Sequence, residues 1–195
     1  YNTFEKLMKA ISKSLKKNDP NHLNLGIRYG YIEQLDDELL RISKESFDAL
    51  SFNCYALSPD HEKMNHALEI SGLPMIIGEY HFGTVDRGLA QSLWQVNSQK
   101  ERGDAFRYYT ENAFAHRGLI GTGWFRWIDQ NINGRTDGEN YNCGFIDVTD
   151  RPYPYMVDAA IETAKSLYEI HSGTKTPFHQ APNAVGHSPI PDLWE

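Results

Sequence analysis

The chain has 195 residues, with 19 basic and 26 acidic side chains and a formal net charge of −7 at pH 7. Hydrophobic residues make up 40% and charged residues 23%, which is typical of a globular protein and excludes a disordered chain or a collagen-like repeat. The sequence contains no basic stripe of the kind that binds nucleic acid and no stretch of 18 apolar residues that could span a membrane. We therefore expect neither a nucleic acid nor a membrane as a partner.

Aromatic residues are frequent, with 11 Tyr, 9 Phe and 4 Trp. Many of them stand beside polar residues at the ends of apolar runs. Such surfaces suit sugars, because an aromatic face buries apolar C–H groups while Tyr and Trp also offer a polar atom. The two cysteines, Cys54 and Cys143, form no disulfide framework or metal-binding spacing. The chain begins with Tyr1 instead of Met, which indicates a processed or partial polypeptide.

The first elements alternate between helix and strand. Residues 2–17 are predicted to form a helix, because apolar side chains recur at helical spacing and Asn2 with Glu5 fits a capping box. Residues 23–28 form a strand candidate, and a helical pattern follows over residues 35–42. A second strand is expected over residues 47–57, and a helix over residues 60–70.

The second half repeats this pattern. Residues 73–80 contain a continuous apolar run, which is typical of a parallel strand buried on both faces. Helical segments are expected between residues 89 and 116, a fourth strand over 119–128 and a last helix over 155–171. After residue 171 four prolines in a polar setting predict an extended segment on the surface. We therefore expect two parts, residues 1–171 and a tail of residues 172–195, whose prolines are Pro177, Pro182, Pro189 and Pro191.

Four strand–helix repeats predict an α/β fold with a parallel sheet, either doubly wound or part of a (β/α)8 barrel. A doubly wound nucleotide-binding sheet usually has a glycine-rich phosphate loop, but the only candidate, beginning at Gly121, has Arg126 where the third glycine belongs. Polar and aromatic residues instead follow the carboxyl end of each predicted strand. Barrel enzymes build their active sites there.

Glu79 is the most informative of these residues, since it ends a buried apolar strand and follows Gly78. A buried carboxylate is costly unless it is paired, hydrogen-bonded or used in chemistry. It can be a structural group that pairs with Arg28 or Arg126. It can also be the nucleophile of a retaining glycosidase, which needs a second carboxyl group about 5 Å away as the acid. Tyr55, after the preceding strand, is placed to hydrogen-bond it.

Three segments carry a resemblance to a known family: residues 73–88, which contain Glu-Tyr-His-Phe-Gly, residues 123–129, Gly-Trp-Phe-Arg-Trp-Ile-Asp, and residues 134–140, Gly-Arg-Thr-Asp-Gly-Glu-Asn. Together with residues 22–28 and 48–55, they resemble the C-terminal half of the catalytic barrel of a β-agarase of glycoside hydrolase family 50. The resemblance implies a parallel (β/α) half-barrel equivalent to strands five to eight of a TIM barrel.

The same resemblance implies a function. It assigns Glu79 as the nucleophile at the end of strand seven, in a retaining hydrolase that cleaves β-1,4-galactosidic bonds of agarose or its oligosaccharides without a cofactor. The acid/base Glu of such enzymes ends strand four, which has no equivalent in this chain. We therefore expect a missing N-terminal half-barrel or a second copy as a partner, and a secreted or periplasmic location because agar cannot enter a cell.

Further residues are candidates for contacting a galactan. Arg28 either contacts sugar or pairs with a buried acid, and His81 either hydrogen-bonds sugar or is packed for structural reasons. We prefer Trp124 to Trp127 as the sugar platform, since alternation along a strand would place the two rings on opposite faces. The remaining candidate substrate contacts are Asn53, Tyr55, Glu139 and Asn140.

A metal is not expected, since the histidines show no metal-ligand spacing. The stretch that contains Asp129, Asn131 and Asn133 nearly fits a calcium loop, but Asn140 occupies its twelfth position and the loop follows a strand. We prefer a turn-rich active-site loop there. Two other functions stay open: a non-catalytic galactan-binding or degenerate glycosidase module, and a β-galactosidase of related barrel type.

Overall fold

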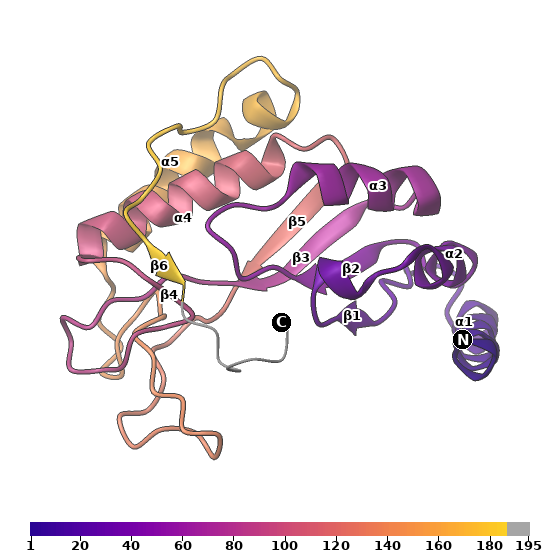
Figure 1. The fold of residues 1–195 in the computed structure, drawn as a ribbon, viewed down its shortest axis with the longest axis horizontal. Coiled ribbons are helices and arrows are strands. Elements are labelled where there is room, and N and C mark those ends of the chain that lie inside the picture. Colours follow the sequence, from indigo (N-terminus) through magenta and orange to yellow (C-terminus); the bar gives the residue numbers. More distant parts are fainter. Residues whose placement is uncertain (187–195) are drawn as a thin grey trace. The chain divides into compact units, whose positions relative to one another are not determined.

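The computed structural model describes residues 1–186, so Pro189 and Pro191 of the predicted tail lie outside the described residues. The chain forms two compact units (Figure 1). Among the described residues, the first comprises residues 1–54, 60–78 and 118–123, and the second comprises residues 55–59, 79–117 and 124–186.

The first unit contains most of a four-stranded sheet and three α-helices. The strands follow the order β1-β2-β3-β5, and β1 pairs with β2 in parallel, with Arg28 opposite Ser51. The helices and strands of this unit are α1 Asn2–Asn18, β1 Arg28–Tyr29, the 3-10 helix η1 Ile32–Gln34, α2 Asp37–Ser46, β2 Leu50–Asn53, α3 His61–Ser71, β3 Met75–Tyr80 and β5 Leu119–Trp124, of which β3 and β5 end in the second unit. The prediction of an α/β chain with a parallel sheet is confirmed, while its equivalence to strands five to eight of a barrel stays a prediction.

The central strands of this sheet are buried by apolar side chains. Leu50 and Phe52 of β2 and Met75 and Ile77 of β3 are fully buried, as expected for the interior of a parallel sheet. A backbone hydrogen bond joins the start of β2 to the residue just before β3, since Leu50 N–H donates to the Pro74 carbonyl. Polar residues follow these buried positions at the carboxyl ends of β2 and β3.

Local capping sets the helix boundaries. The Asp36 carboxylate accepts a 2.9 Å hydrogen bond from Leu39 N–H at the start of α2, and Asp60 accepts one from Glu62 N–H at the start of α3. Each satisfies a backbone donor that the first helical turn leaves unpaired. Gly72, with φ of +67°, ends α3 in the left-handed conformation that glycine adopts most readily.

The second unit is built on α4 Gln99–Phe114 and α5 Pro154–His171, which lie alongside each other (Figure 1). Strand β4, Trp94–Gln95, pairs antiparallel with β6, Val185–Gly186. Tyr80, the last residue of β3, stacks on Tyr109 of α4 with ring centroids 4.1 Å apart. This stacking attaches the end of β3 to the helix that covers it in this unit.

Several predicted boundaries are wrong. The strand expected over residues 23–28 is reduced to Arg28–Tyr29, because Gly26 has φ of +73° and the Asn24 side chain accepts a hydrogen bond from Gly26 N–H, which turns the chain. The helix expected over residues 35–42 begins only at Asp37 and continues to Ser46, and the separate 3-10 helix η1 ends before it at Gln34. The capping box at Asn2 is not formed, since Tyr1 is the N-cap and no side-chain cap bond is present.

The later strands also differ in length from the prediction. The strand expected over residues 47–57 is formed only at Leu50–Asn53, and the one expected over 119–128 ends at Trp124. Beyond Trp124 the backbone bonds are isolated: Phe125 N–H donates to the Tyr80 carbonyl at 2.9 Å, and Ile128 forms a single bridge with Ile146. The short strands β4 and β6 were not predicted, because two-residue strands leave no periodic pattern.

Candidate active site

The proposed nucleophile, Glu79, is the next-to-last residue of β3. The phenolic hydroxyl of Tyr55 donates a 2.8 Å hydrogen bond to its Oε2 atom, and both side chains are half-buried. The hydrogen bond expected from the sequence is therefore present. A partly exposed carboxylate held by a fixed donor has a defined direction, and it remains open to a reactant.

Gly78, directly before Glu79, is surrounded by two of the predicted site residues. A Cβ atom built on Gly78 would lie 2.2 Å from Cδ of Arg28 and 3.3 Å from Oδ1 of Asn53. Glycine therefore allows these two polar side chains to lie directly over the strand. The first unit thus gathers Arg28 and Asn53 at the carboxyl end of its sheet, as the sequence indicated.

His81 is packed inside the second unit and is 1% exposed. Leu93 N–H donates to its Nε2 atom at 3.1 Å, so the ring proton is on Nδ1 and is donated to the Phe125 carbonyl at 3.1 Å. Burial lowers the pKa of His81 to about 3, and the ring is neutral at physiological pH. Both nitrogens are used within the chain, which favours the packed structural role over a sugar contact.

The neutral imidazole also positions Tyr55. The ring of Tyr55 meets His81 edge-on, with centroids 4.9 Å apart, and Phe125 and Tyr141 pack on the same imidazole at 5.8 Å. His81 thus joins three separate segments next to the hydroxyl that contacts Glu79.

Trp124 and Trp127 differ sharply in environment. Trp124 is half-buried, its Nε1–H donates to the Cys143 carbonyl at 2.7 Å, and it lies 5.2 Å from Tyr80 between ring centroids. Trp127 is 68% exposed and stacks on Phe145 at 6.0 Å with an interplanar angle of 19°.

The loop after β5 is held by its own side chains. Glu139 accepts a 2.7 Å hydrogen bond from Gln130 and lies 3.2 Å from Arg135, while Asn140 donates to the Ile132 carbonyl at 3.4 Å. Gly134 and Gly138 have φ of +79° and +90°, which permits tight turns. This arrangement is the turn-rich loop that the sequence favoured.

The Asp129 carboxylate accepts hydrogen bonds from groups of its own chain. Its buried carboxylate accepts hydrogen bonds from Asn142 Nδ2 at 2.9 and 3.0 Å, from Gly144 N–H at 2.7 Å and from the Tyr153 hydroxyl at 2.6 Å. Asn131 accepts from Asn133 N–H at 2.9 Å. Across residues 1–186, no group of three or more His, Cys, Asp or Glu side chains is placed to hold a metal.

Sequence reasoning missed the cation that accompanies Asp129. Arg102 of α4 is fully buried. It donates to the Asn142 carbonyl at 3.1 Å and to the Gly144 carbonyl, and it lies 4.4 Å from the Tyr153 ring centroid. Burial, followed by the hydrogen bond to Asp129, raises the pKa of Tyr153, so its hydroxyl stays protonated and donates. An arginine within a polar helix gives no sequence signal that it is buried.

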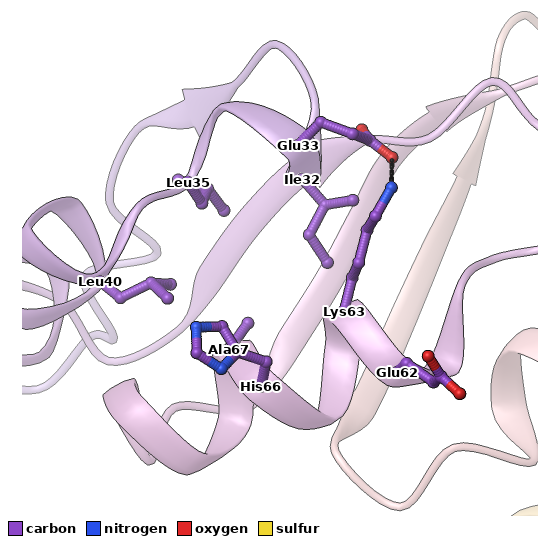
Figure 2. A pocket seen from close by; sticks show the side chains of 8 residues that line it. All are labelled: Ile32, Glu33, Leu35, Leu40, Glu62, Lys63, His66 and Ala67. Atoms are coloured by element: carbon purple, nitrogen blue, oxygen red, sulfur yellow. Dashed lines mark hydrogen bonds and ion pairs between the residues drawn. The ribbon is translucent and has the colours of Figure 1, made fainter.

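A hollow of about 290 Å³ lies in the first unit between η1, α2 and α3. Its apolar wall includes Ile32 and Leu40, and the Glu33–Lys63 ion pair, at 2.9 Å, stands at one side (Figure 2). None of the predicted site residues is among the described residues that line this hollow.

A parallel sheet with a carboxylate at the end of a strand is the arrangement on which barrel glycosidases build their active sites, and the chain is similar to enzymes of that class. More specifically, these relatives are β-agarases. It is 36% identical over 166 residues to β-agarase A of Vibrio sp. strain JT0107 and 34% identical over 170 residues to β-agarase B of that strain, covering 82% and 84% of this chain. It spans about a sixth of the length of these curated relatives, 16% and 17%.

Solved structures agree. The structure of PfGH50B matches with a TM-score of 0.80 and 36% identity over 86% of this chain and 24% of that chain. An exo-β-agarase structure matches with a TM-score of 0.80 and 34% identity over 88% of this chain and 23% of that chain. No protein-family model matches the sequence. Within residues 1–186, no helix is long and apolar enough to cross a membrane.

Proposed function

We propose that this chain is part of a retaining glycoside hydrolase that cleaves β-1,4-galactosidic bonds of agarose or its oligosaccharides, with Glu79 as the nucleophile. The observation that carries the proposal is the hydrogen bond from Tyr55 to a half-buried carboxylate at the end of a strand. Homology to β-agarases over most of the chain supports the substrate class.

In this mechanism the Glu79 carboxylate attacks the anomeric carbon and forms a glycosyl–enzyme ester while a carboxylic acid protonates the departing oxygen. Water then attacks the anomeric carbon of the glycosyl–enzyme, the conjugate carboxylate takes a proton from this water, and Glu79 leaves as the free carboxylate. Tyr55 keeps the nucleophile oriented throughout. Arg28, Asn53, Trp124, Glu139 and Asn140 are the proposed substrate contacts.

The acid/base carboxyl is proposed to come from a part of the barrel outside this chain or from a second copy. The first unit supports this, because α1 exposes Leu7, Ile11 and Leu15 at one helical spacing, with 43–53% of each side chain accessible. The chain also spans only about a quarter of the matched agarase structures. We expect the remainder of the barrel to cover these side chains, and the complete protein to be secreted or periplasmic.

The direct test replaces Glu79 by Gln in the full natural polypeptide. Hydrolysis of agarose oligosaccharides should fall by about 10⁴-fold or more, since the amide cannot form the ester. Glu62→Gln, an exposed residue of α3, is the matched control and should retain full activity. Activity of the Glu79→Gln protein within tenfold of the wild type would show that the nucleophile is another residue.

The same assay separates the other functions. Tight binding of neoagaro-oligosaccharides by the wild type without release of reducing ends would indicate a galactan-binding or degenerate module. Faster hydrolysis of a nitrophenyl galactoside than of agarose oligosaccharides would indicate a β-galactosidase.

A further inference from the structure

A row of aromatic rings leads from β3 to the surface of the second unit. Tyr80, the neighbour of Glu79, contacts Trp124 at 5.2 Å between ring centroids, Trp124 contacts Phe145 at 5.8 Å, and Phe145 contacts Trp127 at 6.0 Å. The first three rings are half-buried or buried. Trp127 ends the row with 68% of its surface exposed.

The backbone of Trp127 is fixed although its side chain is exposed. Its carbonyl accepts hydrogen bonds from Phe145 N–H at 2.8 Å and from Ile146 N–H at 3.1 Å. The near-parallel ring of Phe145 covers one face of the indole, which leaves the other face to solvent. A rigid aromatic ring with one open face binds a sugar ring at low entropic cost, because no side chain has to be ordered on binding.

We infer that Trp127, backed by Phe145, is a second sugar platform, which binds a galactan unit other than the one attacked by Glu79. This inference rests on the proposed function and adds a preference for long chains. Trp124 is the inner ring of the row, and its indole N–H is already used by Cys143. Only a substrate long enough to reach the outer end of the row gains the additional contact.

The test compares Trp127→Ala with the wild type in the full natural polypeptide, using neoagarotetraose as the short substrate and agarose as the long one. We expect the KM for agarose to rise about five- to tenfold, the size of one aromatic stacking contact, with kcat within twofold of the wild type. The kinetics on neoagarotetraose should not change. Equal changes on both substrates, or no change on agarose, would overturn the inference.

Two variants keep the result interpretable. Trp127→Tyr retains a stacking ring and should recover most of the agarose KM even if the alanine variant folds poorly. Tyr168→Ala removes an aromatic ring of α5 that is 88% exposed, and it should leave both substrates unaffected. A tyrosine variant as weak as the alanine variant would contradict a stacking role.

A binding measurement separates this inference from the proposed function. If the wild type hydrolyses neither substrate, the proposed function fails, and the affinity for soluble agarose is then compared between wild type and Trp127→Ala by calorimetry. A five- to tenfold weaker affinity of the variant supports the platform on its own. Equal affinities, or no binding by either protein, overturn it.

Discussion

Tyr55 and Glu79, 24 positions apart in the sequence, are joined by a 2.8 Å hydrogen bond between the phenolic hydroxyl and Oε2 of the carboxylate. The tyrosine follows β2 and the glutamate is the next-to-last residue of β3, so their contact depends on neighbouring parallel strands ending at the same edge of the sheet. The ring of His81 packs against Tyr55 and limits its movement.

Tyr55→Phe removes this hydrogen bond and retains the ring contact with His81. Hydrolysis of agarose oligosaccharides should decrease about 10- to 100-fold in kcat, since a hydrogen bond to a charged group contributes about 1.5–3 kcal/mol. Steady-state kinetics check this, with Tyr168→Phe as a control on an exposed tyrosine. An unchanged kcat would mean that the contact does not assist the reaction.

His81 predicts a pH dependence of stability. Burial lowers the pKa of His81 to about 3 in the folded chain, whereas an unfolded histidine has a pKa of about 6.5. The unfolded state binds the extra proton between these values, so the stability contribution is complete above pH 6.5 and is lost as the pH falls toward 3.

His81→Gln has no titrating group at this position and should show a smaller loss. The free energy of unfolding of the wild type should decrease by up to about 1.4 kcal/mol per pH unit more than that of the variant below pH 6. Denaturant titrations of both proteins at pH 7, 6 and 5 measure this difference. Parallel pH profiles would show that folding does not lower the pKa of His81.

Arg102 and Asp129 form the charged centre of a buried network in the second unit. Arg102→Leu leaves the buried Asn142 and Gly144 carbonyls without their donor and removes a positive charge that acts on the Asp129 carboxylate, which should destabilise the fold by about 3–5 kcal/mol. Arg41→Leu, which removes an exposed ion pair with Asp37, should cost less than about 1 kcal/mol. Chemical denaturation compares them, and equal losses would refute the importance of the buried network.

Gly103 lies where α4 approaches the beginning of α5. A Cβ atom there would lie 2.5 Å from the Tyr155 carbonyl oxygen, so Gly103→Ala should destabilise by about 1–3 kcal/mol although alanine favours helices by about 1 kcal/mol. Gly121→Ala is the matched control, since its nearest neighbour would be 3.7 Å away. A more stable Gly103→Ala protein would show that the two helices can separate at no cost.

The elements with a strong periodic pattern were predictable from sequence. The helix over residues 2–17 and the strand over 73–80 appear within a few positions of their predicted bounds, and the hydrogen bond between Tyr55 and Glu79 follows from parallel strand ends. Exceptions arose where a local backbone contact overrode the pattern. Residues 23–28 were predicted as a short apolar strand, but Gly26 takes a positive φ and the side chains of Leu23, Leu25 and Ile27 are exposed.

The packing within the site was less predictable. Both ring nitrogens of His81 form hydrogen bonds with backbone groups. These groups belong to Leu93 and Phe125, which lie 12 and 44 positions away in the sequence. The same holds for Arg102, whose partners Asn142 and Gly144 come from a loop without periodicity. Sequence patterns report burial of apolar faces, whereas such polar contacts are set by loops whose course no pattern describes.

The central claim, that Glu79 attacks the anomeric carbon, is tested most directly by trapping the glycosyl–enzyme. A 2-deoxy-2-fluoro-β-galactosyl fluoride provides a good leaving group while its 2-fluorine slows hydrolysis of the ester, and mass spectrometry of peptides from the full natural polypeptide then locates the attached sugar. The proposed mechanism predicts one added fluorogalactosyl group on the peptide that contains Glu79 and none in the Glu79→Gln protein. An adduct on a different carboxylate would contradict it.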